Sequence, residues 1–317
     1  MKKNFVREKR IYCGKYLEVD IFNYSKVPNG KRSKRIKLSP PKQRNLNDKN
    51  SKRYFNQIVN CNFNENDLHV SCSYKNKFLP KTYEDSQKVV RNFIRRINNK
   101  IESLKKKLIK QMEGMNEEQK KVQMESIEKL TKVKYICVTE CKEDKNGKAV
   151  RLHHHIILSG ILDRDTVEKL WSTKDEKGKK VSIGFINADR LQPNEEGLKD
   201  LVGYLTKYSD EKYKSLKNEK YIRRKRWSQS RNLIKPEVAT NDSKYGKNIL
   251  RHLGLNPNDR EFWEKQYPGY TFTSATSFFN GDLGWIVYAK FRKEKYISWR
   301  YLKYTKKIQK DIGQKEY

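Results

Sequence analysis

The sequence predicts an α+β protein in which helices pack on β-structure, and three patterns in its 317 residues support this prediction. An apolar stripe with the 3.6-residue period of a helix runs through 90–108. An Asn-Gly pair at 146–147 lies between two alternating segments, which is typical of a tight antiparallel hairpin. Further alternating segments occur at 16–24 and 66–74. Because a one-sided helix needs a flat apolar surface to cover, we expect the strands to supply it.

The chain is strongly basic, with 72 Lys and Arg residues against 38 Asp and Glu and a formal net charge of +34. Such a charge favours a polyanionic partner. Apolar and charged residues each make up 35% of the chain, which leaves one modest core. The 19 tyrosines and 5 tryptophans argue against a disordered tail. These aromatic rings either fill the core or stack on the unpaired bases of single-stranded nucleic acid.

Several classes of protein are excluded at this stage. The sequence has no run of about 18 apolar residues, so we expect no membrane-spanning segment. The basic N-terminus lacks the apolar stretch of a secretory signal, which favours a cytoplasmic protein. The five cysteines are odd in number and never spaced C-x-x-C, a pattern that favours buried thiols over disulfides or a zinc knuckle.

In chain order, residues 1–53 hold 17 basic and 4 acidic residues and predict a basic N-terminal arm that contains one strand at 16–24. The segment 66–74 and a turn at 78–80 precede the long helix. Its apolar stripe consists of Val90, Phe93, Ile94, Ile97, Ile101, Leu104 and Leu108. Its basic face is either solvated or in contact with DNA, and comprises Lys88, Arg91, Arg95, Lys106 and Lys107.

The remaining elements follow from similar signals. A second short helix is predicted before Val133, and another helix begins after Asp163, which is a plausible N-cap. A strand near 181–186 and a helix over 195–213 come next. The last 28 residues are basic and aromatic, and we expect 241–317 to form a basic C-terminal extension.

The Asn-Gly turn predicts a register for the hairpin around it. If Asn146 and Gly147 form the loop and no bulge follows, Glu140 lies opposite His153 and Val138 lies opposite His155. Paired side chains share one face of a sheet, with Cβ atoms about 4.5 to 5.5 Å apart. Glu140, His153 and His155 therefore converge on one face, and we expect them to hold a divalent metal.

His154, between the two ligands, points to the opposite face beside Thr139, because strand side chains alternate. Two nitrogen ligands and one oxygen favour Mn²⁺ or Zn²⁺ over Mg²⁺, although availability in the cell also decides which ion binds. We expect Mn²⁺ or Mg²⁺ as the cofactor.

The predicted helix over 195–213 brings two tyrosines and a lysine together. Tyr204 and Tyr208 are four residues apart and project from the same face, and Lys207 is adjacent to them. A phenol attacks a phosphate usefully when a metal polarises that phosphate and a cation offsets the added negative charge. Alternatively, such a pair of tyrosines packs in a core.

The order of these motifs resembles the HUH endonucleases of rolling-circle replication initiators. In that family two histidines flank a bulky residue, here His153, His154 and His155, and a later motif is Y-x-x-K, here Tyr204 to Lys207. The second tyrosine, Tyr208, resembles the two-tyrosine gene A proteins of small single-stranded DNA phages. The family's first motif is usually threonine-rich, and here it reads HVSCSY at 69–74. The segment WSQSRNLIKP at 227–236 is similar to the stretch after the tyrosine helix in replication proteins of Gram-positive phages and plasmids, so that the resemblance covers about 16–237.

The resemblance implies an endonuclease domain at 54–240 with a central antiparallel sheet and packed helices, related to ferredoxin-like and RNA-recognition folds. It implies that Tyr204 nicks single-stranded origin DNA with metal assistance, leaving a 5′-phosphotyrosine and a 3′-OH primer, and that the strand is later rejoined. Lys207 would neutralise charge at the phosphate, and Tyr208 is either a second nucleophile or a packing residue. The implied setting is the cytoplasm of a bacterial host.

The expected partners are origin DNA, a host helicase and a host DNA polymerase. The chain contains no G-x-x-x-x-G-K-[ST] phosphate loop, so we expect no nucleotide cofactor and no motor of its own. We expect the DNA to be contacted by basic and aromatic residues on either side of the motifs, namely Lys31, Arg32, Lys34, Arg35, Arg223, Arg224, Arg226, Trp227 and Arg231.

Two alternatives stay open. A conjugative relaxase or a single-strand transposase would use the same chemistry. A non-catalytic protein with an RNA-recognition-like sheet would explain the charge and the aromatic rings without nicking, but it predicts aromatic residues on the central strands where this chain has LHHHIIL at 152–158.

Overall fold

The computed structural model describes residues 4–25, 41–143, 149–215 and 227–293, and for residues 4, 41–45, 141–143, 149–151 and 208–215 it describes the backbone alone. The protein has an α+β fold with antiparallel sheets, as the sequence predicts. It divides into two compact units. We call Arg35–Lys235 the central unit, and Met1–Lys34 together with Pro236–Tyr317 the terminal unit.

The central unit contains the predicted hairpin and the tyrosine helix. Its elements are α1 (Pro41–Asn62), β3 (Leu68–Cys72), the 3₁₀ turn η1 (Asn76–Phe78), α2 (Tyr83–Gln111), the 3₁₀ turn η2 (Met112–Gly114), α3 (Glu117–Lys129), β4 (Tyr135–Glu143), β5 (Ala149–Leu158), α4 (Arg164–Lys169), β6 (Ser172–Lys174), β7 (Lys180–Ser182), β8 (Ile186–Arg190), α5 (Lys199–Ser215) and β9 (Ser228–Gln229).

A five-stranded antiparallel sheet lies at the centre of this unit, in the order β8-β3-β5-β4-β9. Four of its strands and the helices α2 and α4 follow one another along the chain in the order β3, α2, β4, β5, α4 and β8. This connectivity is the split β-α-β arrangement of ferredoxin-like sheets. The β4–β5 hairpin therefore lies beside β3, and β5 is the central strand of the sheet, with β3 on one side and β4 on the other.

The long helix α2 covers one face of the sheet. It begins after Thr82, whose side chain accepts a hydrogen bond from the backbone N–H of Asp85 and so satisfies one of the free donors of the first turn. The predicted apolar stripe is confirmed from Val90 to Ile101, where its residues are buried. They pack with the sheet and with α4 in one cluster that includes Val70, Phe93, Ile97, Ile156, Val167 and Trp171.

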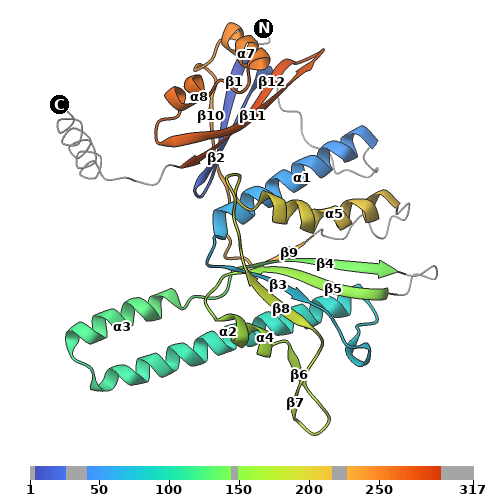
Figure 1. Ribbon diagram of the computed structural model, residues 1–317, viewed down its shortest axis with the longest axis vertical. Helices are drawn as coiled ribbons and strands as arrows, with labels where there is room; N and C mark the ends of the chain where they lie inside the picture. The colour runs from blue at the N-terminus through green and yellow to red at the C-terminus, as the bar shows by residue number, and fades with distance from the viewer. Residues whose placement is uncertain (1–3, 26–40, 144–148, 216–226, 294–317) are drawn as a thin grey trace, which may run out of the picture. The chain divides into compact units, whose positions relative to one another are not determined.

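Helices α1 and α5 cover the opposite face, so that the sheet lies between two helical layers (Figure 1). Their buried side chains join alternate strand residues in a second cluster, which includes Phe55, Ile58, Val138, Ile157, Val202 and Leu205. Since successive strand residues point to opposite faces, each side chain that the structure describes in β4 and β5 belongs to one of these two layers.

His154 belongs to the layer under α2 and is fully buried. Its Nδ1 lies 2.9 Å from Thr139 Oγ1 and its Nε2 lies 2.6 Å from the hydroxyl of Tyr74. The amide of Gln87 in α2 donates to Thr139 Oγ1 at 2.7 Å, which extends the network into the helix. Burial, followed by the neighbouring imidazoles, lowers the pKa of His154 to about 3. This side chain is therefore neutral at physiological pH, and the prediction that it lies beside Thr139 is confirmed.

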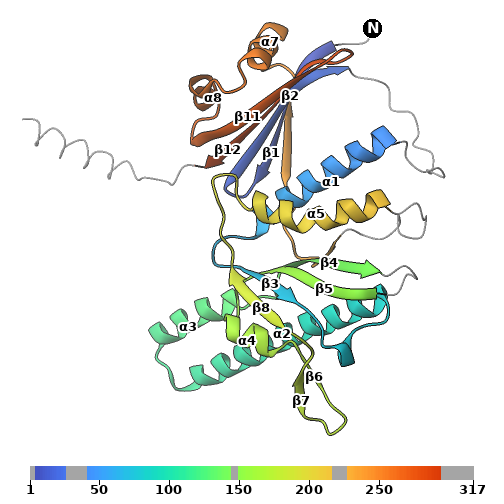
Figure 2. The same cartoon turned by 45° about the vertical axis from the view of Figure 1, so that its right-hand side comes forward.

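The terminal unit has its own five-stranded antiparallel sheet, in the order β10-β1-β2-β12-β11. Helices α7 and α8 pack on one face of it, and Figure 2 shows both on the same side. Its elements are β1 (Asn4–Cys13), β2 (Tyr16–Ser25), β10 (Glu237–Asn241), α7 (Lys247–Leu255), α8 (Arg260–Gln266), β11 (Tyr270–Asn280) and β12 (Gly284–Lys293).

This unit corrects the predicted domain organisation. The strand predicted at 16–24 is present, but it pairs with β1 and β12 in a folded sheet, where an arm was expected. Val6, Leu17, Val19 and Ile21 are buried in its core, and basic residues between them gave the segment a composition typical of an arm. The predicted boundary at 53 falls inside α1, and the predicted boundary at 240 falls inside β10.

Two predicted elements of the central unit have different bounds. The strand expected near 181–186 is interrupted at Gly184, where a Cβ atom would lie 2.0 Å from the backbone oxygen of Ser73. The helix expected from 195 begins at Lys199, because Asn194 and Gly197 pair in a turn in which Gly197 has a φ of 80°.

Within the described part of the chain, no helix combines the length and the apolar character that crossing a membrane requires. Cys13, Cys72 and Cys137 are free and buried, and Cys61 is free and partly buried, in line with the prediction of unpaired thiols.

We predict that the metal-free protein loses stability as the pH falls from about 6.5 toward 4. An unfolded histidine binds its proton near pH 6.5, whereas the buried His154 resists protonation down to about pH 3. Over this window the unfolded state holds more protons, so the free energy of unfolding rises with pH and falls on acidification. Urea unfolding with a chelator present, at pH 7, 6, 5 and 4, measures the slope. A His154→Gln variant should give a flatter curve, and equal slopes for the two proteins would contradict the prediction.

Candidate metal centre

The β4–β5 hairpin has the predicted register over the candidate ligands. Glu140 pairs with His153, and Val138 pairs with His155. The register shifts by one residue between Lys142 and Glu143, so the assumption of an unbroken ladder fails near the turn. Asn146 and Gly147 themselves lie outside the described residues. The bulge lies beyond the ligands and leaves their shared face unchanged.

Glu140, His153 and His155 converge on the face that α1 and α5 cover. Glu140 Oε2 lies 2.8 Å from His153 Nε2, and Glu140 Oε1 lies 3.4 Å from His155 Nε2. One ligand atom of each residue can be chosen so that all lie within 4.8 Å of one another. Glu140 and His155 are buried and His153 is partly exposed, which leaves one side of the group open to solvent. The three side chains could hold a metal ion.

Two polar atoms in this group are buried without a hydrogen bond, and they test whether an ion fits. Glu140 Oε1 and His155 Nε2 have no hydrogen-bond partner among the described residues. A buried carboxylate oxygen or imidazole nitrogen in this state costs free energy unless something compensates it. A cation bound between them would satisfy both atoms at once, so the donor set fits a metal.

The electrostatics of Glu140 also favour a cation. Burial would raise the pKa of its carboxyl group, but the adjacent imidazoles of His153 and His155 outweigh burial and lower that pKa to about 2. The carboxylate is therefore ionised at any physiological pH. A fixed negative charge in a partly dry site attracts a divalent ion strongly.

Strand β3 orients the ring of His155. Its Nδ1 lies 3.3 Å from Ser71 Oγ and 3.2 Å from His69 Nε2, and the rings of His69 and His155 stack with centroids 5.4 Å apart. Burial, followed by the charge of His155, lowers the pKa of His69 to about 4, so His69 is neutral at pH 7. With Nδ1 held by these partners, Nε2 is directed toward Glu140. Partners of this kind fix the orientation of metal-binding histidines.

The roles of Ser71 and His69 do not follow from the sequence pattern. The alternating pattern at 66–74 places both on one face of a strand. Their role depends on the pairing of Ser71 with His155, which is a contact between strands 84 residues apart. Local patterns carry no information about that pairing.

The predicted nucleophile lies next to the ligand set. The ring of Tyr204 in α5 packs edge-on against His155, with centroids 5.3 Å apart and an interplanar angle of 85°. About half of the Tyr204 side chain is exposed (49%). Helix α5 is anchored by the buried side chains of Leu198, Val202 and Leu205, which turn the tyrosine toward the sheet.

The other predicted site residues have different placements. Lys207 is exposed on α5, one turn from Tyr204, and the side chain of Tyr208 lies outside the described residues. Trp227 packs against Phe55 at 4.8 Å and donates to Gln229 Oε1 at 2.8 Å, and Arg231 is exposed. The remaining predicted DNA contacts lie outside the described residues, namely Lys31, Arg32, Lys34, Arg35, Arg223, Arg224 and Arg226.

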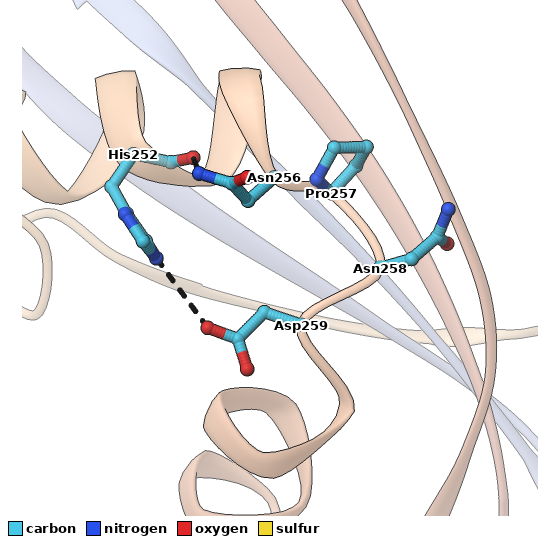
Figure 3. Close-up of a pocket in the computed structure, with 5 residues that line it drawn as sticks. All are labelled: His252, Asn256, Pro257, Asn258 and Asp259. Atoms are coloured by element: carbon cyan, nitrogen blue, oxygen red, sulfur yellow. Dashed lines mark hydrogen bonds and ion pairs between the residues drawn. The ribbon is translucent and has the colours of Figure 1, made fainter.

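An open pocket of about 530 Å³ lies in the terminal unit, at the connection between α7 and α8 (Figure 3). It is lined by His252, Asn256, Pro257, Asn258 and Asp259. His252 Nε2 lies 3.4 Å from Asp259 Oδ2, and Asp259 also caps α8 through the backbone N–H of Phe262. The pocket has one imidazole and one carboxylate and includes none of the candidate metal ligands.

Comparisons with known proteins gave no assignment. No protein-family model matches the chain, and searches of curated proteins and of solved structures found no significant match. A function is therefore inferred from the geometry of the site itself.

Proposed function

We propose that the protein is a rolling-circle replication initiator of the HUH endonuclease type, which nicks single-stranded origin DNA and joins it to a tyrosine. The observation that carries this proposal is the contact between the ring of Tyr204 and His155, inside a group that can hold a metal. A metal site alone fits many functions. A half-exposed phenol beside a metal ligand specifically suits attack on a phosphodiester.

The cofactor is proposed to be Mn²⁺ or Mg²⁺. Glu140 would supply an oxygen ligand, and His153 and His155 would each supply a nitrogen through Nε2. Two imidazole nitrogens and one carboxylate oxygen favour Mn²⁺ or Zn²⁺ over Mg²⁺, and the exposed side of His153 leaves room for substrate oxygens. When bound, the ion acts as a Lewis acid on a non-bridging phosphate oxygen.

Tyr204 is proposed to attack the phosphorus of one phosphodiester. Its oxygen forms a bond to phosphorus while the bond from phosphorus to the 3′ oxygen breaks. The phenol loses its proton, and the departing 3′ oxygen gains one, so the products are a 5′-phosphotyrosine and a free 3′-OH. Because the phosphotyrosine retains the bond energy, a later attack by a 3′-OH rejoins the strand without ATP.

Lys207 and Tyr208 have proposed supporting roles. Lys207 is one turn from Tyr204 on α5, and its exposed ammonium group can neutralise the negative charge on the phosphate. Tyr208 would act as a second nucleophile when the displaced strand is closed. Unwinding and extension of the 3′-OH would fall to a host helicase and a host polymerase in the cytoplasm, since the chain has no phosphate loop.

Features of the central strands favour an enzyme over a non-catalytic nucleic-acid-binding protein. A binding sheet of the RNA-recognition type carries aromatic rings on its central strands, where they stack on bases. The corresponding strands here present His69, Ser71, His153 and His155 on the ligand face. Helices α1 and α5 cover only part of that face, since His69, Ser71 and His153 are partly exposed. A relaxase or a transposase would share the nicking step.

We predict that the protein binds Mn²⁺ through the three ligands. With the ion at about one hundred times its dissociation constant, the folded state should gain about 2.7 kcal/mol, which thermal unfolding detects. Glu140→Gln and His153→Ala should lose this gain. Ser71→Ala, which removes one partner of His155 Nδ1, should weaken binding by about 10- to 100-fold. Calorimetry with Mn²⁺ and with Mg²⁺ measures the affinities.

The matched control is His252→Ala, which removes an imidazole that faces a carboxylate in the other unit. It should bind Mn²⁺ as the unmodified protein does. Glu140, with a pKa of about 2, stays ionised across the pH range of the assay, so its carboxylate remains available to the ion. Binding that survives in Glu140→Gln and His153→Ala would place the metal elsewhere.

We further predict that the protein forms a covalent adduct with DNA. A labelled single strand that contains the origin, incubated with Mn²⁺, should give a band that resists denaturing electrophoresis. Tyr204→Phe should reduce this adduct by at least about 10³-fold, because it removes the nucleophile. Tyr208→Phe should leave the first adduct intact and reduce rejoining. If the adduct persists in Tyr204→Phe and is lost in Tyr208→Phe, the proposed order is reversed; if neither change matters, the proposed function is wrong.

A further inference from the structure

Phe185 has the largest exposed fraction, 70%, of the large hydrophobic side chains in the described part of the chain. It lies between β7 and β8, immediately before Ile186 at the start of β8. Its ring makes no contact with another aromatic ring among the described residues. Singly exposed apolar residues are common on protein surfaces, so exposure alone assigns Phe185 no role, and its position in the sheet is what relates it to the candidate metal centre.

The backbone around Phe185 is held firmly although its ring is exposed. The N–H of Ser73 donates to the carbonyl of Phe185 at 2.8 Å, and the N–H of Lys75 donates to the carbonyl of Ile183 at 2.9 Å. The indole of Trp171 fixes Ser73 in turn, by donating to its carbonyl at 2.9 Å. Gly184 permits this approach, since a Cβ atom there would lie 2.0 Å from Ser73 O. The ring is therefore presented from a rigid base, which limits the entropy lost on binding.

The position of Phe185 relates it to the candidate metal ligands. The hydrogen bond from Ser73 continues the β3–β8 register, which pairs Cys72 with Ile186. On its other side β3 pairs with β5, and Cys72 lies opposite His154. One step further along this antiparallel ladder, Ser73 comes opposite His153. His153 faces Glu140. Phe185 thus begins a row across the sheet that ends at the metal ligands.

The register assigns Phe185 a position on the ligand face. Ile186 packs into the cluster under α2, and Phe185, which precedes it and continues the β3–β8 ladder through Ser73, takes the alternate position. Asn187, two residues on, pairs with Ser71 on that same face. With strands about 4.8 Å apart, Phe185 lies roughly 10 Å from the strand of His153, a span of a few nucleotides.

Charges near this row are compatible with a nucleic-acid strand. Lys75 follows Ser73 and pairs through its backbone with the segment that leads to Phe185. Asp189 is the acidic residue farther along the ligand face of β8, and Arg164 lies 3.2 Å from its carboxylate. This ion pair offsets the charge of the acid.

We propose that Phe185 is a base-stacking residue, on which a base of the single strand rests close to the phosphodiester that Tyr204 attacks. The inference rests on the proposed function and adds how the strand is placed. Every base has a π-face, so stacking on one ring tolerates any sequence while it limits how the strand can lie. The ring would hold one end of the strand segment and the metal ligands the other.

The test compares two probes that differ only in their bases. The full chain carrying Tyr204→Phe is titrated with a fluorescent oligothymidylate and with an abasic strand of equal length, and anisotropy gives both affinities. Phe185→Ala should weaken binding of the oligothymidylate by about 5- to 150-fold and leave the abasic strand unchanged. Phe185→Trp should restore binding. The matched control is Phe279→Ala, which removes a phenyl ring that is 64% exposed in the terminal unit.

The outcomes separate this inference from the proposed function. If Phe185→Ala affects both strands equally, or neither, or if Phe185→Trp fails to restore binding, stacking at this ring is refuted. If the base-dependent loss is present but the chain with Tyr204 intact forms no adduct, the contact stands and nicking is wrong. If the adduct forms and oligothymidylate binding is indifferent to Phe185, nicking stands and the stacking role is wrong.

Discussion

The cross-strand pairing of Glu140 with His153 is the constraint on which the rest of the site depends. It places a carboxylate and two imidazoles on one face of a single hairpin, so the ligands are neighbours before any tertiary contact forms. A slip of one residue between β4 and β5 would separate the carboxylate from the imidazoles, because one of the two strands would then turn these positions toward the layer under α2. The bulge between Lys142 and Glu143 lies beyond the ligands and does not disturb this pairing.

The two helical layers surround alternate side chains of β5 with different environments. His154 enters the core under α2, where Thr139 and Tyr74 bind both of its ring nitrogens and burial keeps it neutral. His153 and His155 enter the other layer, where α5 brings Tyr204 against His155. Three consecutive histidines thus serve two purposes, one structural and one at the candidate metal centre. The physical cause is the two-residue period of a strand between unlike surroundings.

Strand β3 links the site to the sheet edge. Ser71 and His69 hold Nδ1 of His155, and the continuation of β3 at Ser73 holds the backbone of Phe185. His155 and Phe185 are therefore positioned by Ser71 and Ser73, which are two residues apart at the end of β3. In the proposed function, this arrangement would place the phosphates of a single strand at the candidate metal centre and one of its bases at Phe185.

Local patterns in the sequence determined the α2 stripe, the hairpin register at Glu140 and the helical spacing of Tyr204 and Lys207. Each depends on residues close together in the chain, where backbone geometry alone decides which side chains are neighbours. The terminal sheet could not be foreseen, because β1 and β2 pair with strands more than 200 residues later and their basic residues gave the composition of an arm. The same reason applies to Ser71, His69 and Phe185. Their roles come from contacts between distant strands, and only the tertiary structure decides which strands become neighbours.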